Sequence, residues 1–176
     1  EQFAYDPHCS DALSMLVTQL TNQPLRIFFE ENIWKKLRPA GAAAWLSPRL
    51  NPELTSGANV FYAPMGDYAL IAQMILNGGK LHGETIISEK WIKQMHEDIV
   101  RVPQSESANF RYYGYQTWVK SGNKDSWFAG LGNLGQRFYL DPKNNSAMII
   151  FALDFEHIPD TDRLWDWFRN TRLNGL

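Results

Sequence analysis

The chain has 176 residues, of which 44% are hydrophobic and 14% aromatic, a composition that fits one globular domain. Its formal net charge is −2 and its basic residues are scattered, which argues against a nucleic-acid partner. No apolar run approaches the roughly 20 residues of a membrane-spanning helix, and the single cysteine, Cys9, excludes an internal disulfide.

Apolar spacing predicts helices in the first half of the chain. The first covers about 9–21, with Leu13, Leu16, Val17 and Leu20 on one side. A second begins at Pro24, a third covers about 65–77, and a short fourth runs from Ser88 to Met95. Residues 38–64 are rich in proline and show no clear period, which predicts irregular structure.

Strand patterns begin beyond Val100. We expect strands over 113–120, 126–129, 137–140 and 147–153, and then a helix from Asp160 with Leu164, Trp167 and Phe168 along its apolar stripe. Segment 147–153 is apolar on both faces, which predicts a central strand. The expected fold class is α+β, an antiparallel meander with packed helices.

Two short motifs match known formulas outside their required context. Gly130-x-Gly132-x-x-Gly135 has the letters of the dinucleotide fingerprint, which needs a helix after the glycines, whereas a strand pattern comes after them here. Ser121-x-x-Lys124 has the letters of the penicillin-recognising nucleophile motif, in which the serine opens a helix. Between two strand patterns it favours a hairpin turn instead.

The remaining candidates are a tyrosine and four histidines. The histidines are His8, His82, His96 and His157, and their dispersal suggests no metal site and no cofactor. Tyr5 precedes the first helix, where a rigid turn could present it as a general base if neighbouring charge lowered its pKa. The competing interpretation is a core tyrosine packed beside Phe3.

Several segments together resemble the serine β-lactamase-like hydrolases, in particular the branch of class C β-lactamases, esterases and nylon-oligomer hydrolases. The segments are, in chain order, Phe3-x-Tyr5-x-x-x-x-Ser10-Asp11-x-Leu13, Gln23-Pro24-Leu25, residues 65–79, 83–91 and 113–118, and Gly132 to Pro142. No strand pattern or Ser-x-x-Lys helix precedes Tyr5. We therefore expect residues 1–176 to be a single partial domain, with the nucleophile in an upstream N-terminal half.

The resemblance implies roles for five residues. Tyr5 takes the place of the catalytic tyrosine, and the backbone N–H of Gln136 would form half of the oxyanion hole. Asn133, Leu134 and Gly135 fall on the family's substrate-binding strand, where Lys-Thr-Gly or His-x-Gly is usual.

Substrate and compartment stay open from the sequence. The small-molecule substrate could be an amide, an ester or a β-lactam, and the compartment the bacterial periplasm or cytoplasm. Two positions depart from the family pattern, Pro7 in place of Asn or Ser and Asn133 in place of a cationic or titratable residue. Both favour the alternative of a catalytically inactive binding or interaction domain.

Overall fold

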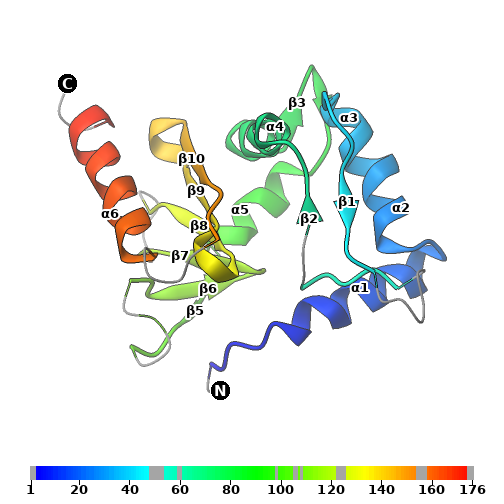
Figure 1. Cartoon of the computed structure of the whole chain (residues 1–176), viewed down its shortest axis with the longest axis horizontal. Coiled ribbons are helices and arrows are strands. Elements are labelled where there is room, and N and C mark those ends of the chain that lie inside the picture. Colours follow the sequence, from blue (N-terminus) through cyan, green and yellow to red (C-terminus); the bar gives the residue numbers. More distant parts are fainter. Residues whose placement is uncertain are drawn as a thin grey trace. The chain divides into compact units, whose positions relative to one another are not determined.

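The computed structural model describes residues 3–47, 54–58, 61–97, 99–104, 107, 109–121, 126–153 and 158–173. The chain divides into two compact units, Glu1–Ser88 and Glu89–Leu176 (Figure 1). Within the described residues, no helix combines the length and the apolar character that crossing a membrane requires.

The first unit is mainly helical. Its elements are α1 (His8–Thr21), α2 (Leu25–Phe29), the π-helical η1 (Glu30–Trp34), α3 (Lys35–Leu37), β1 (Ala44–Trp45), β2 (Phe61–Tyr62), α4 (Met65–Leu76), β3 (Lys80–Leu81) and β4 (Glu84–Thr85). The helices expected over 9–21, from Pro24 and over 65–77 are confirmed. Two short antiparallel pairs, β1 with β2 and β3 with β4, were not predicted.

Aromatic side chains form the centre of the first unit. Phe29 packs edge-on against Trp45 at 4.8 Å and Phe61 at 5.4 Å between ring centroids. Phe61 also contacts Trp34, and the Tyr68 hydroxyl donates a hydrogen bond of 2.8 Å to the Phe61 carbonyl. This cluster joins α2, η1, the β1–β2 pair and α4 into one core.

The second unit is an antiparallel sheet with helices on it. Its elements are α5 (Glu89–Glu97), β5 (Val100–Arg101), β6 (Tyr112–Gly114), β7 (Thr117–Val119), β8 (Phe128–Leu131), the 3-10 turn η2 (Asn133–Gly135), β9 (Arg137–Asp141), η3 (Pro142–Asn144), β10 (Ser146–Ile150), α6 (Ile158–Phe168) and the π-helical η4 (Arg169–Leu173). The strand order is β10-β9-β8-β7-β6-β5, a simple meander. This arrangement confirms the α+β prediction.

The two helices cover opposite faces of this sheet (Figure 1). On β9, Tyr139 stacks on Trp165 of α6 with ring centroids 5.2 Å apart. On β8, the Phe128 ring stacks on His96 of α5 at 4.8 Å. Phe128 pairs with Leu140, the neighbour of Tyr139, so strand alternation places Phe128 and Tyr139 on opposite faces.

The strand predicted over 113–120 is wrong, because the chain reverses in its middle. Tyr115 and Gln116 have φ of 46° and 66°, so both central residues adopt the left-handed conformation of a two-residue hairpin turn. The Tyr113 hydroxyl donates to Gln116 Oε1 at 2.7 Å, and the Thr117 hydroxyl donates to the Gly114 carbonyl at 2.6 Å. Side-chain hydrogen bonds thus stabilise a turn that lacks the usual glycine or asparagine.

The central position predicted for segment 147–153 is also wrong. Its strand, β10, covers Ser146–Ile150 and lies at the end of the strand order, paired only with β9 among the described strands. Every β10 side chain is partly exposed. An edge strand that is apolar on both faces leaves hydrophobic surface and backbone groups open to another chain segment.

The apolar stripe predicted for the last helix is wrong in part. Leu164 and Trp167 are exposed, whereas Trp165 is fully buried and Phe168 contacts it at 5.9 Å. The buried side of α6 is therefore centred one position away from Leu164. Apolar periodicity predicted the helix correctly, but the contact with Tyr139 determines which side of α6 is buried.

Replacing His96 with phenylalanine should remove part of the acid sensitivity of the fold. Burial beside Phe128 lowers the pKa of His96 below its usual value of about 6.5, against the raising effect of the Ile92 carbonyl, which accepts a 2.9 Å hydrogen bond from Nδ1. A lowered folded-state pKa means that the unfolded chain binds the proton first. The contribution of neutral His96 to the free energy of unfolding is therefore complete above about pH 6.5. It is lost as the pH falls through the folded-state pKa. Denaturant unfolding between pH 7.5 and 5 should show a smaller loss of stability for His96→Phe, and identical profiles would contradict the assignment.

Candidate functional site

Tyr5 lies outside regular secondary structure, three residues before α1 begins, and is 45% exposed. The next residue, Asp6, fixes the entry into the helix, because its Oδ1 accepts the His8 backbone N–H at 2.9 Å and the His8 ring Nδ1 at 2.8 Å. The backbone hydrogen bond from His8 is the main cause that lowers the pKa of Asp6. Asp6 thus performs the capping role, although Pro7 separates it from the first helical residue.

The first half of α1 is clamped by residues 54–58. Asp11 Oδ1 accepts the Ser56 hydroxyl at 2.7 Å and the Ala58 N–H at 3.2 Å, and the Ser56 hydrogen bond is the main cause of the lowered pKa of Asp11. The Ser14 hydroxyl donates to the Thr55 carbonyl. Gly57 approaches so closely that a Cβ there would lie 2.3 Å from the Ser10 carbonyl oxygen. These contacts hold the helix that begins after Tyr5.

Asn133, Leu134 and Gly135 form a 3-10 turn between β8 and β9. This differs from the substrate-binding strand that the resemblance implies. Leu134 has φ of 63° and Gly135 has φ of 87°, and two successive left-handed residues interrupt the strand path. The turn closes through a 2.9 Å hydrogen bond from the Gly132 N–H to the Gln136 carbonyl.

The dinucleotide fingerprint is excluded because its glycines lead into a strand. Gln136 is extended, with φ of −62° and ψ of 136°, and β9 begins at the next residue. No helix end is therefore available there to hold a pyrophosphate. The glycine at 132 has a local reason, since a Cβ would lie 2.8 Å from Gln136 Oε1.

The Ser121 motif is flanked by paired strands, as the hairpin prediction required. β7 and β8 pair through Trp118 with Ala129 and Val119 with Phe128, and the Ser121 N–H donates to the Ser126 hydroxyl at 2.8 Å. Residues 122–125 lie outside the described residues. Ser121 itself lies beyond the end of β7 and is not helical, whereas the nucleophile motif requires a serine that opens a helix.

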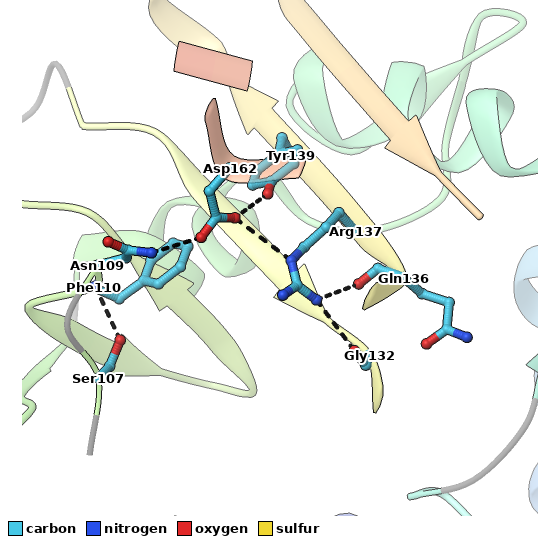
Figure 2. A network of polar contacts seen from close by, with 8 residues as sticks. All are labelled: Ser107, Asn109, Phe110, Gly132, Gln136, Arg137, Tyr139 and Asp162. Carbon is cyan, nitrogen blue, oxygen red and sulfur yellow. Dashed lines mark hydrogen bonds and ion pairs between the residues drawn. The ribbon is translucent and has the colours of Figure 1, made fainter. Parts of the chain in front are cut away.

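Gln136 is held at two points beside the turn, and Figure 2 shows the one at its carbonyl. Its carbonyl accepts the guanidinium Nη1 of Arg137 at 2.8 Å in addition to the Gly132 N–H. Its side-chain Nε2 donates to the Ala152 carbonyl at 2.8 Å, beyond the end of β10.

Arg137 belongs to a buried polar network with α6 (Figure 2). Its Nε lies 3.5 Å from Asp162 Oδ1, an ion pair without hydrogen-bond geometry at that nitrogen. Asp162 also accepts the Tyr139 hydroxyl and the Asn109 amide, the latter at 2.6 Å. Burial, and after it the hydrogen bond to Asp162, raises the pKa of Tyr139, so that its hydroxyl stays protonated and donates.

Sequence reasoning missed Arg137 and Asp162. A signal was present, since Arg137, Tyr139 and Asp141 alternate with apolar residues along one strand and therefore share one face. A polar face on a strand suggests solvent, whereas here α6 covers it. Asp162 lies far along the chain, and no local pattern connects it to Arg137.

The structure brings four of the five predicted site residues together in one turn. These are Asn133, Leu134, Gly135 and Gln136. Tyr5 belongs to the first unit, and a cleft shared with this turn stays a prediction. In the part of the chain that is described, no group of three His, Cys, Asp or Glu side chains could hold a metal ion.

Comparison with known proteins shows which proteins this chain is similar to. No protein-family model matches the chain. It is 25% identical over 168 residues to a 6-aminohexanoate-dimer hydrolase of Paenarthrobacter ureafaciens, an alignment covering 93% of the chain and 42% of that protein. A candidate 6-aminohexanoate-dimer hydrolase from Bacillus anthracis superposes with a TM-score of 0.78 at 20% identity, over 97% of this chain and 44% of that one. A candidate β-lactamase from Bacteroides dorei DSM 17855 gives a TM-score of 0.53 at 15% identity, over 81% and 50%.

The chain thus spans less than half the length of the hydrolases that share the name 6-aminohexanoate-dimer hydrolase, and nearly all of it takes part in the match. The helices and the antiparallel meander agree with the expected architecture. The chain therefore has the α+β fold found in the C-terminal part of the β-lactamase-like hydrolases.

Proposed function

We propose that this chain supplies Tyr5 and the Gln136 backbone N–H to a serine hydrolase that acts through an acyl-enzyme. The nucleophile would be a Ser-x-x-Lys serine in an upstream half of the same domain. That serine attacks the carbonyl carbon, Tyr5 and the lysine move the proton to the leaving group, and water then releases the acyl group. The substrate would be an amide, an ester or a β-lactam.

The observation that carries this proposal is the agreement of two comparisons on one name. A sequence relative and a solved structure, each matched over at least 93% of this chain, are both named for hydrolysis of the 6-aminohexanoate dimer. That compound is a short linear amide, which makes it the first substrate to test. The described residues contribute a defined geometry for the turn but no serine at a helix start with a lysine three positions later.

Exposed apolar side chains support an upstream half as the missing partner. On α1, four large apolar side chains are between 48% and 76% exposed: Leu13, Met15, Leu16 and Leu20. In the second unit, Phe151 and Leu153 continue the apolar edge strand and are exposed as well. Surfaces of this kind favour contact with another protein segment. The relatives, which are more than twice as long as the matched region, have residues to provide it.

The full-length gene product should hydrolyse the 6-aminohexanoate dimer or a chromogenic ester, whereas this chain alone should not. Tyr5→Phe in the full-length protein should lower kcat by about a hundredfold, as expected for loss of a general base. Tyr115→Phe is the matched control, because Tyr115 is also 45% exposed and lies in a hairpin turn. A mass increase on the upstream serine after quenching would identify the acyl-enzyme.

Two results would oppose the proposal. Turnover by this chain alone that disappears in Ser121→Ala would overturn the proposed division of the active site. A folded full-length protein that neither turns over nor forms an acyl-enzyme with an amide, an ester or a β-lactam would support the alternative of an inactive binding domain. Pro7 and Asn133 are the observations that favour that alternative.

A further inference from the structure

The buried guanidinium of Arg137 contacts both ends of the turn that carries Gln136. Arg137 is 5% exposed, and its Nη1 donates to the Gly132 carbonyl at 3.2 Å and to the Gln136 carbonyl at 2.8 Å. These two carbonyls (Figure 2) lie at the two ends of the segment from Asn133 to Gln136. A planar guanidinium suits this task, because its N–H groups have fixed directions.

The turn needs such a clamp because its backbone is unfavourable by itself. Leu134, which is not glycine, has φ of 63°, a conformation that persists only where surrounding contacts enforce it. The hydrogen bond between Gly132 and Gln136 provides one constraint. Arg137 adds two more constraints from a single side chain, and they act on the peptide groups at the two ends of the segment that contains Leu134 and Gly135.

Asp162 holds Arg137 in this position. Its carboxylate pairs with the arginine Nε at 3.5 Å and is itself oriented by the Tyr139 hydroxyl and by the Asn109 amide at 2.6 Å. Both partners are largely buried, with exposed fractions of 5% and 16%. A buried arginine requires a counter-charge, so α6 determines where the guanidinium lies.

We propose that Arg137, anchored by Asp162, is a positioning residue that sets the orientation of the Gln136 backbone N–H. This inference rests on the proposed function, in which that N–H stabilises the oxyanion. Arg137 touches no reacting atom in this arrangement. Its contribution passes through the turn, and its loss should reduce transition-state stabilisation more than substrate binding.

The hold on the turn can be tested on the present chain. In Arg137→Lys a compact ammonium replaces the planar guanidinium and keeps the positive charge, but it cannot reproduce both hydrogen bonds to the turn. Backbone amides 132–136 should therefore exchange hydrogen about tenfold faster. Amides of Val119 and Phe128, deep in the sheet, should be unaffected.

Arg169→Lys is the matched control. Arg169 Nε donates to the buried Asp141 at 2.7 Å, so it also ties the C-terminal helical segment to β9. Its hydrogen bond and its ring contacts lie away from the turn, and its replacement should leave amides 132–136 unchanged. If Arg137→Lys does not fold, Asp162→Asn offers a second route, since it removes only the counter-charge and should loosen the same amides.

The catalytic consequence is tested in the full-length protein. Arg137→Lys should lower kcat about ten- to a hundredfold while KM stays within about twofold, because small misplacements of a catalytic group have effects of this size. Arg169→Lys should retain kcat. A rise in KM at constant kcat, or unchanged exchange of amides 132–136, would overturn the inference. A full-length protein without any hydrolase activity would instead overturn the proposed function, while the exchange result would still decide whether Arg137 holds the turn.

Discussion

Trp165→Ala should lower the free energy of unfolding by about 3–5 kcal/mol, the range observed when a buried tryptophan is truncated. Trp165 is fully buried between the sheet and the rest of α6. It stacks on Tyr139 at an interplanar angle of 5°, meets Trp127 edge-on at 5.9 Å, and has the Arg169 guanidinium 6.0 Å from its ring. Removing the ring would leave a cavity lined by rigid aromatic groups that cannot close it.

Two further substitutions distinguish the loss of buried packing at Trp165 from the loss of an exposed tryptophan and from the loss of the indole N–H. Trp167→Ala, on the same helix, removes a side chain that is 54% exposed and should cost about 1 kcal/mol or less. Trp165→Phe should cost less than Trp165→Ala, because it keeps an aromatic ring and removes the indole N–H, which has no hydrogen-bond partner among the described residues. Denaturant unfolding monitored by tryptophan fluorescence measures all three, and equal losses for Trp165→Ala and Trp167→Ala would contradict the described core.

Gly79→Ala should destabilise the first unit by about 2–4 kcal/mol, the sum expected for backbone strain and steric overlap. Gly79 has φ of 86°, and a Cβ would lie 2.0 Å from the Ile87 carbonyl oxygen. The neighbouring backbone cannot simply move away. The Gly79 carbonyl accepts hydrogen bonds from the Ile86 N–H at 2.9 Å and the Ile87 N–H at 3.1 Å, so a shift would break the contacts that close β3 and β4.

Gly83→Ala is a control with the same strain and no overlap. Gly83 has φ of 82°, but a Cβ there would have no neighbour within 4 Å among the described residues. Its substitution should cost about 1 kcal/mol from backbone strain alone. The difference in thermal unfolding midpoint between the two variants measures the cost of the steric overlap. Equal midpoints would show that the backbone at Ile87 moves aside without loss of stability.

Tertiary contacts also decided details that local patterns misjudged. The hairpin at Tyr115 and Gln116 depends on side-chain hydrogen bonds from Tyr113 and Thr117, which replace the glycine signal on which turn prediction relies. The strand β10 has an interior composition but lies at an edge of the described sheet. Its composition and its position are reconciled if a further segment pairs with it, which is what the proposed upstream half would supply.

The sequence by itself determined the helices of the first unit and the α+β class, because apolar spacing over a few consecutive residues specifies them. The resemblance to β-lactamase-like hydrolases also identified Gln136 and the three residues before it as candidate site residues. Only the tertiary structure revealed that Arg137 clamps this turn and that Asp162 anchors the arginine. Asp162 lies on another element that packs onto the sheet, and the pairing of two buried charges depends on that packing, which no local sequence period encodes.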